Sequence, residues 1–278
     1  MPFFASIDGT RLYYDVIGDE ALPPLVVLAG GPARHPEYLG DLAGLSQVRS
    51  LLVLHQRGVG RSEPSPEVET ARWPELAEDV EALRATLGLD RVAVLGHSAG
   101  TRVALSYAAR YPDRTERLCL VTPPATWLLP EADDSSEIID AHRDEPWFRS
   151  FEEARDLATA ARGARELIAL FPALAPIGWA RWDDTARAHE QVGEWHADAL
   201  DRFFAEVDAI DLRARLAAVG CDVLVVAGQQ DGLTGLAPVV AMADMFPSGT
   251  AAVIDGCGHY PWVEQPEEFS RVVREHLA

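Results

Sequence analysis

The sequence comprises 278 residues, of which 48% are hydrophobic, and it carries a formal net charge of −20 at pH 7. This acidity argues against nucleic acids and anionic membranes as partners. No stretch approaches the ~18 uninterrupted apolar residues of a membrane span, and residues 1–9 lack the basic region of a signal peptide, so we expect a cytoplasmic protein. The three cysteines form no Cys-x-x-Cys pair, so we expect neither a metal site nor a disulfide framework.

Residues 1–124 alternate between short apolar runs and helical patterns. The turn signal Asp8-Gly9 predicts a β-hairpin over 3–16, and apolar residues at helical spacing predict a helix over 73–87. Strands that alternate with helices predict a mostly parallel sheet with helices on both faces. The further strands that we predict in this part cover 25–28, 50–55, 92–95 and 117–121.

The alternation stops after residue 124, and residues 125–210 show helical and turn patterns with no convincing strand. This stretch holds five of the seven tryptophans, which is typical of a helical lid over a site. We therefore predict a core over 1–124, a lid over 125–210 and a second core part over 211–278. In the second core part we predict strands over 222–227 and 251–254, and helices over 238–245 and 266–277.

The segment 92–100 contains a Gly-x-Ser-x-Gly motif centred on Ser98. An apolar strand leads into it and a helix-forming run follows, as in a nucleophile elbow. Gly96 and Gly100 lack Cβ atoms, which lets strand and helix approach closely while the hydroxyl of Ser98 projects from the turn. A Gly/Ser turn in an ordinary α/β protein is the alternative interpretation.

A serine hydroxyl needs a base, and the base needs a carboxylate that orients it. Asp231 follows the predicted strand 222–227, and His259 lies in a Gly-rich loop after the last predicted strand. The order Ser, Asp, His is that of an α/β-hydrolase triad. We therefore predict Ser98 as nucleophile, Asp231 as acid and His259 as base.

The tetrahedral intermediate of acyl transfer needs two backbone N–H donors. One is predicted at Ala99, directly after the nucleophile. The other is predicted in the loop after an early strand, at Gly30 and Gly31, where glycine permits close approach of a substrate.

These motifs resemble those of a lidded α/β-hydrolase, and within that superfamily the chain is similar to the proline iminopeptidase family. The resemblance is carried by Gly30-Gly31-Pro32, by the run Gln-Arg-Gly-Val-Gly-Arg-Ser over 56–62, and by the triad motifs. It covers the core, about two thirds of the chain, and says little about the lid. The family usually has His-Gly-Gly-Pro-Gly, Asp before the Gln-Arg-Gly run, and often Trp after the nucleophile. This chain departs from that pattern at Ala29, Ala33, His55 and Ala99.

The resemblance implies an acyl-enzyme mechanism that needs no metal or organic cofactor. Our first hypothesis is an aminopeptidase that releases a small N-terminal residue, in the manner of a proline iminopeptidase. The second is an esterase, lactonase or amidase that acts on a small metabolite. The third is a non-catalytic binding protein that retained the fold, against which the intact set of Ser98, Asp231 and His259 argues. We expect a small molecule or a short peptide as the substrate.

A substrate with a free amine needs a carboxylate partner under the lid. We predict one helix over 185–204, on which Glu190, Glu194 and Asp201 recur at spacings of four and seven and so share a face. That face is our candidate amine site, and a solvated acidic surface is the alternative.

Overall fold

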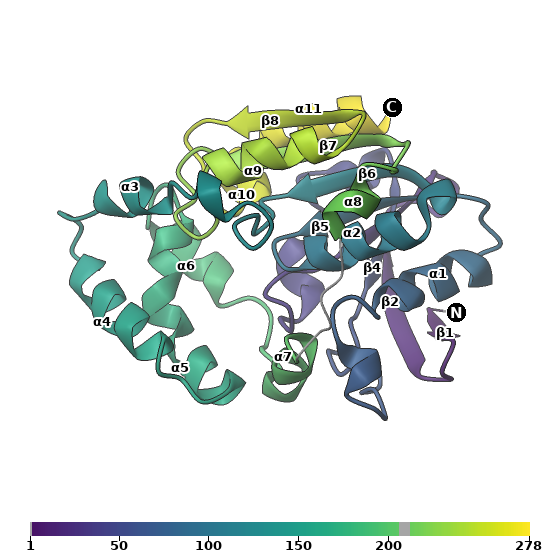
Figure 1. The fold of residues 1–278 in the computed structure, drawn as a ribbon, viewed down its shortest axis with the longest axis horizontal. Helices are drawn as coiled ribbons and strands as arrows, with labels where there is room; N and C mark the ends of the chain where they lie inside the picture. Colours follow the sequence, from purple (N-terminus) through teal and green to yellow (C-terminus); the bar gives the residue numbers. More distant parts are fainter. Residues whose placement is uncertain (1, 206–211) are drawn as a thin grey trace.

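An eight-stranded sheet forms the centre of the computed structural model, which describes residues 2–205 and 212–278 (Figure 1). Its strands, β1 to β8, are Phe3–Ala5, Arg11–Ile17, Pro24–Leu28, Ser50–Leu54, Val92–His97, Thr115–Val121, Asp222–Gly228 and Gly249–Ile254. They lie in the order β1-β2-β4-β3-β5-β6-β7-β8. β2 pairs antiparallel with both of its neighbours, β1 and β4. Every other pair of neighbouring strands is parallel.

The central strands are continuous apolar runs because both faces of the sheet are covered. Every residue of β4 and β5 is buried, whereas several residues of β8, the last strand of the sheet, are exposed. All the predicted strands are present, with ends that differ by one or two residues. The predicted mostly parallel sheet is thus confirmed.

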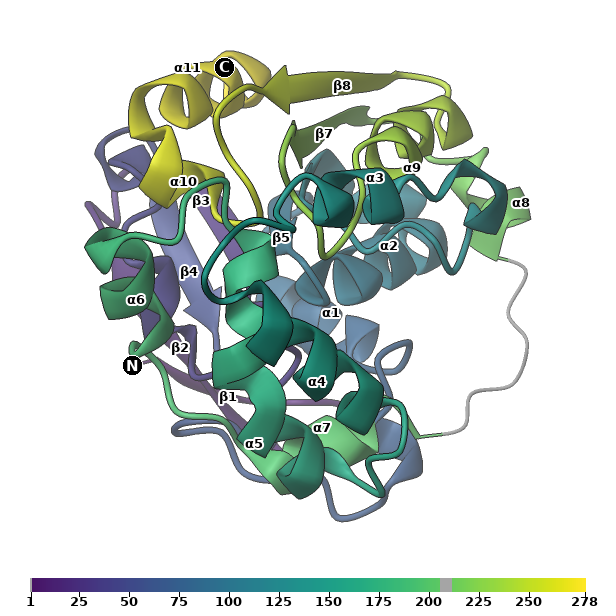
Figure 2. The ribbon, with the colours of Figure 1, turned by 90° about the vertical axis from the view of Figure 1, so that its left-hand side faces the viewer.

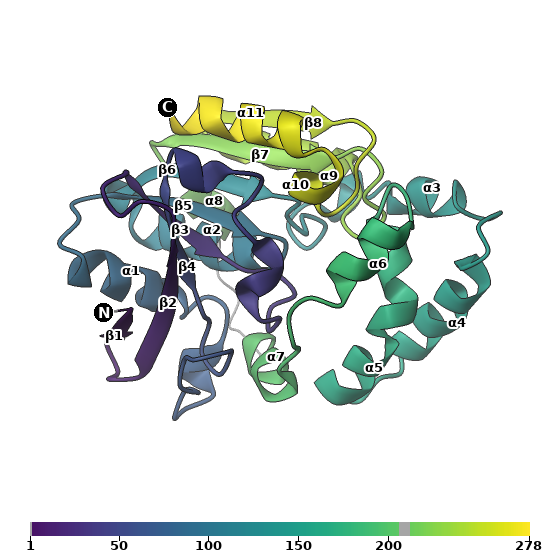
Figure 3. The ribbon, with the colours of Figure 1, turned by 180° about the vertical axis from the view of Figure 1, so that it is seen from behind.

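Helices pack on both faces of the sheet and enclose two apolar cores. One face carries α1 (Ala77–Thr86), α2 (Gly100–Arg110), α8 (Leu212–Leu216) and α9 (Ala237–Ala241) (Figure 1). The opposite face carries α10 (Pro261–Glu264) and α11 (Pro266–Leu277), which Figure 3 shows from behind. The helix predicted over 73–87 begins only at Ala77, and the helix predicted over 238–245 ends at Ala241, where a 3-10 turn follows.

The chain leaves the sheet after β6 and forms a set of helices before it returns to β7 (Figure 2). These are α3 (Ser135–Asp140), α4 (Phe148–Ala158), α5 (Ala164–Leu174), α6 (Asp184–Glu190) and α7 (Ala197–Phe203). Figure 2 shows α4, α5 and α6 in front of the sheet, so these helices form the inserted lid that the fold prediction includes.

The prediction of a single helix over 185–204 is wrong, because two shorter helices, α6 and α7, occupy this segment. Gly193 interrupts the helical pattern between them with a φ of +89°, in the left-handed region that favours glycine. A Cβ at this position would also lie 2.6 Å from the carbonyl oxygen of His35. The helical pattern therefore gives way to a close backbone contact between the lid and the core.

None of the helices in the described ranges is long and apolar enough to cross a lipid bilayer.

Candidate active site

Ser98 lies on a sharp turn between β5 and α2. Its φ of +50° is unusual for a residue with a side chain and marks a strained turn. A Cβ at Gly96 would lie 2.8 Å from the Cα of Thr101, and one at Gly100 would collide with the carbonyl oxygen of Leu28. Both glycines are therefore required for the tight passage from strand to helix that the motif predicts.

Asp231 and His259 lie on the loops that follow β7 and β8, and the structure brings them together. The Nδ1 of His259 lies 2.7 Å from Oδ2 of Asp231, so Nδ1–H donates to the carboxylate and Nε2 is left as an acceptor. Asp231 is completely buried and also accepts hydrogen bonds from the Leu233 amide and the Thr234 hydroxyl. These bonds fix the carboxylate against the imidazole.

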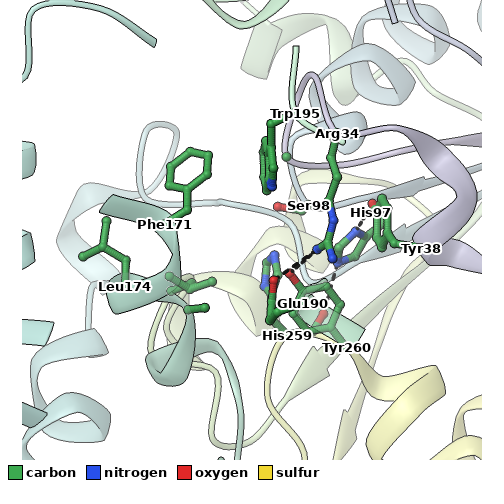
Figure 4. Close-up of a pocket in the computed structure, with 13 residues that line it drawn as sticks. Arg34, Tyr38, His97, Ser98, Phe171, Leu174, Glu190, Trp195, His259 and Tyr260 are labelled. Atoms are coloured by element: carbon green, nitrogen blue, oxygen red, sulfur yellow. Dashed lines mark hydrogen bonds and ion pairs between the residues drawn. The ribbon is translucent and has the colours of Figure 1, made fainter. Parts of the chain in front are cut away.

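Ser98 and His259 line the same cavity, which has a volume of about 190 Å³ (Figure 4). In residues 2–205 and 212–278, Ser98 forms hydrogen bonds through its backbone N–H, to Val121, and its carbonyl oxygen, from Thr101, and the hydroxyl forms none. Hydrogen bonds between nucleophile and base are often long in substrate-free enzymes. The arrangement leaves the hydroxyl facing the space in which a substrate would lie.

Backbone N–H groups beside Ser98 differ in their availability. The N–H groups of Ala99 and Gly31 donate to no other group in residues 2–205 and 212–278. The N–H of Gly30 donates to the Tyr38 hydroxyl at 2.7 Å, so the expectation that Gly30 serves as an oxyanion donor needs correction. Gly30 instead permits close packing, because a Cβ there would lie 2.6 Å from the Cβ of Ser98.

His97, which occupies the first of the two variable positions of the Gly-x-Ser-x-Gly motif, belongs to a buried series of hydrogen bonds that the sequence did not predict. Its Nε2 donates to the carbonyl oxygen of His259 at 3.1 Å, and its Nδ1 accepts from the Tyr38 hydroxyl at 2.7 Å. Burial, with a smaller effect of the His259 ring, holds the pKa of His97 well below its usual range. The neutral imidazole therefore links the turn at Ser98 to the loop that carries His259.

The rest of the cavity is mostly apolar, with one buried ion pair. Its further lining residues are Gly31, Arg34, Tyr38, His97, Phe171, Leu174, Ala175, Glu190, Trp195, Leu233 and Tyr260. Glu190 supplies the only carboxylate in this set. Its Oε2 lies 3.3 Å from Nη1 of Arg34 (Figure 4). Its Oε1 accepts from the indole N–H of Trp179 at 2.9 Å.

Arg34 is 2% exposed, and its guanidinium is surrounded by acceptors and aromatic rings. It donates to the carbonyl oxygens of Val192 and His189 and to the hydroxyl of Tyr260, and it lies 4.5 Å from the centre of the Tyr38 ring. The sequence did not predict this residue, because its hydrogen-bond partners lie more than 150 positions away in the chain.

The lid is tied to the core at the edge of this cavity. Two backbone hydrogen bonds, with N–O distances of 2.7 and 2.9 Å, join lid segment 194–196 to segment 33–35. Trp195 pairs with Arg34 in this short antiparallel contact. The lid therefore meets the core directly beside the loop that carries Gly31.

Glu194 and Asp201 do not join Glu190 in the cavity. Glu194 is exposed, and it contacts the core through its carbonyl oxygen, which accepts from the N–H of His35. Asp201 is exposed, and its carboxylate accepts from the N–H of Ala164 at the start of α5. The prediction that the three acidic residues share one helical face is wrong, because α6 ends at Glu190 and the chain turns away there.

A known protein family matches most of the chain. The alpha/beta hydrolase fold family matches residues 23–266. The chain belongs to the α/β hydrolases. In the described residues of this α/β hydrolase, no cluster of His, Cys, Asp and Glu side chains has the size and geometry to hold a metal ion.

Individual relatives of this α/β hydrolase carry different activities in their names. A proline iminopeptidase of Xylella fastidiosa is 35% identical over 114 residues, a match that spans 41% of this chain but only 36% of the relative. A putative carbamate hydrolase of Caulobacter is 27% identical over 98% of this chain and 97% of its own length. An esterase structure from Thermogutta terrifontis superposes with a TM-score of 0.73 at 25% identity, covering 99% of this chain and 97% of that one.

Proposed function

We propose that this α/β hydrolase is a serine hydrolase in which Ser98 is the nucleophile, His259 the base and Asp231 the orienting acid. The observation that carries the proposal is the 2.7 Å contact between His259 and Asp231 beside the cavity that Ser98 enters from its strained turn. The carboxylate fixes the tautomer in which Nε2 is free to accept a proton.

The proposed reaction has two steps. Nε2 of His259 takes the Ser98 proton as the hydroxyl oxygen attacks the substrate carbonyl, and the N–H groups of Ala99 and Gly31 stabilise the oxyanion. His259 then returns that proton to the leaving alcohol or amine, which leaves an acyl group on Ser98. Water then attacks the acyl group while His259 takes one of its protons. His259 passes that proton to the Ser98 oxygen as the acyl bond breaks, which releases the carboxylic acid and restores the Ser98 hydroxyl. The mechanism requires no metal or organic cofactor.

We propose small uncharged esters, lactones or amides as the substrates. The cavity is mostly apolar, and its one carboxylate, on Glu190, is already paired with Arg34 and the Trp179 indole. A substrate ammonium group would lose its hydration there without gaining a free carboxylate, at a cost of several kcal/mol. The charge balance of the cavity therefore favours a neutral substrate.

An aminopeptidase of the proline iminopeptidase type is the second candidate. The 35% identity to the Xylella proline iminopeptidase over 114 residues supports it, as do the motifs at 30–32 and 56–62. An N-terminal amine would then have to displace Arg34 from Glu190 or bind in its neutral form.

Three chromogenic substrates separate these candidates. Proline p-nitroanilide carries the free amine, and N-acetyl-proline p-nitroanilide and p-nitrophenyl butanoate lack it. The main proposal expects kcat/KM for N-acetyl-proline p-nitroanilide, which has the same leaving group, to exceed that for proline p-nitroanilide by about 10-fold or more, and it expects p-nitrophenyl butanoate to be hydrolysed. A requirement for the free amine would favour the aminopeptidase. Failure to hydrolyse any of the three, together with no reaction of Ser98 with a fluorophosphonate, would favour a non-catalytic binding protein.

A further inference from the structure

A second cavity, of about 470 Å³, lies next to the catalytic cavity. The two cavities share four lining residues, which are Phe171, Ala175, Glu190 and Trp195. The second cavity extends from this shared wall towards Ile168 and Trp182 and contains neither Ser98 nor His259. Because the first cavity is less than half as large, this wall limits the room beside the nucleophile.

Trp195 is held in this wall by contacts on several sides. Its ring lies against the backbone of Gly31, where a Cβ would be 2.5 Å from the indole Cη2. The ring of Phe171 packs against it with a centroid distance of 4.4 Å, and the Arg34 guanidinium lies 5.6 Å from the ring centre (Figure 4). The backbone of Trp195 is also held by the pairing of segments 194–196 and 33–35. These contacts from several sides oppose rotation of the indole out of the wall.

The position of the indole places it in the path of a long acyl group. Gly31 is one of the two proposed oxyanion donors, so the substrate carbonyl lies close to it in the reaction. A chain that extends from that carbonyl towards the lid meets the indole of Trp195 before it reaches the second cavity. Phe171 lies on the lid helix α5 and supports the indole from the other side.

We propose that Trp195 determines the substrate size, by confining acyl groups to the small cavity and closing off a second cavity that fits an extended aliphatic or aromatic chain. The proposal rests on the proposed serine hydrolase function. Ile168, Pro172 and Trp182 give the second cavity an apolar side against which such a chain can be buried from water, while Arg187 and Gln191 supply polar groups at its lining.

The test is a chain-length series of p-nitrophenyl esters, from ethanoate to decanoate, measured as kcat/KM. The native chain is expected to prefer short acyl groups. Trp195→Ala is expected to raise the ratio of decanoate to butanoate activity by about 10-fold or more, because it joins the two cavities. Trp195→Phe, which keeps a ring, is expected to lie between the two. Trp182→Ala is the matched control, since Trp182 lines only the second cavity, and it should keep the native preference for short chains.

Reaction with a fluorophosphonate shows whether each variant is folded and competent. If Trp195→Ala does not react, the ratio for Trp195→Phe decides the question. An unchanged ratio in a reactive variant overturns the proposal, and so does an equal change in Trp182→Ala. If the native chain neither hydrolyses an ester nor reacts with the probe, the proposed function itself fails, which is a distinct result.

Discussion

The Nε2 atom of His97 donates a hydrogen bond to the carbonyl oxygen of His259, with a separation of 3.1 Å. The residue before the candidate nucleophile thereby holds the backbone of the candidate base. The Thr122 hydroxyl donates to the same carbonyl, also at 3.1 Å. The position of His259 is therefore set by two strands, β5 and β6, that end beside it.

Tyr38→Phe tests the role of this hydrogen-bond chain. The change removes only a hydroxyl, but it leaves the Gly30 N–H and the Nδ1 of His97 buried without a partner. We expect a loss of about 1–3 kcal/mol in the free energy of unfolding, because unsatisfied buried polar groups carry that cost. We also expect kcat to fall more than KM rises, because the loops that carry Gly30 and His259 lose their alignment. Urea unfolding and steady-state kinetics measure the two effects. If Tyr38→Phe keeps the native free energy of unfolding and the native kcat, these hydrogen bonds do not position the site.

Asp231→Asn tests the orienting acid. The amide cannot accept the Nδ1 proton as a carboxylate does, so the imidazole is left in the wrong tautomer. We expect kcat to fall by about 10⁴-fold, with slower but detectable fluorophosphonate labelling. Steady-state hydrolysis of one ester substrate measures kcat, and a time course of labelling measures the reaction with the fluorophosphonate. Activity close to native would place the acid elsewhere.

Much of the fold and of the candidate site was predictable because local signals suffice for both. Buried parallel strands are continuous apolar runs, and the turn at Ser98 needs the two glycines of its motif. Asp231 and His259 could be predicted to lie together because each follows the end of a strand, and the loops after parallel strands converge at one edge of the sheet.

The lid could not be predicted in the same way because its structure depends on contacts distant in sequence. Helical spacing over 185–204 predicted one helix, but Gly193 packs against the backbone of His35 and ends that pattern. The pairing of Arg34 with Glu190 joins residues 156 positions apart, so no local motif marks it. His97 stood in a variable position of its motif, and only the fold shows what it contacts.

Glu190→Gln tests whether the cavity carboxylate serves Arg34 or a substrate amine. Loss of its charge leaves the guanidinium of Arg34 buried without a counterion, so we expect about 3–5 kcal/mol of destabilisation. We expect hydrolysis of aminoacyl and plain acyl substrates to change by similar factors. Glu194→Gln is the control, and its exposed side chain should alter stability by less than about 0.5 kcal/mol. A selective loss of aminoacyl substrates in Glu190→Gln would instead support the aminopeptidase.

Histidines whose pKa is lowered by burial make the stability of the fold sensitive to acid, among them His97, His189 and His276. Burial lowers the pKa of His189 and of His276 from 6.5 to about 4, and it holds the pKa of His97 well below 6.5. Between pH 6.5 and 4 the unfolded chain therefore binds more protons than the folded chain, so acidification favours unfolding. Each group adds a slope of up to about 1.4 kcal/mol per pH unit in that window.

Urea unfolding across this pH range measures that slope. His276→Gln, on α11 and outside the candidate site, is expected to flatten it without affecting catalysis. Stability that stays constant from pH 7 down to the lowered pKa of about 4 would contradict this account.

The assignment of Ser98 as nucleophile is the central claim, and covalent labelling tests it most directly. Trypsin cleaves after Arg91 and Arg102 and releases a peptide over residues 92–102 in which Ser98 is the only serine. After reaction with a fluorophosphonate, mass spectrometry should find one adduct, on this peptide, and Ser98→Ala should show neither the adduct nor ester hydrolysis. An adduct on a different peptide, or hydrolysis retained in purified Ser98→Ala, would contradict the account.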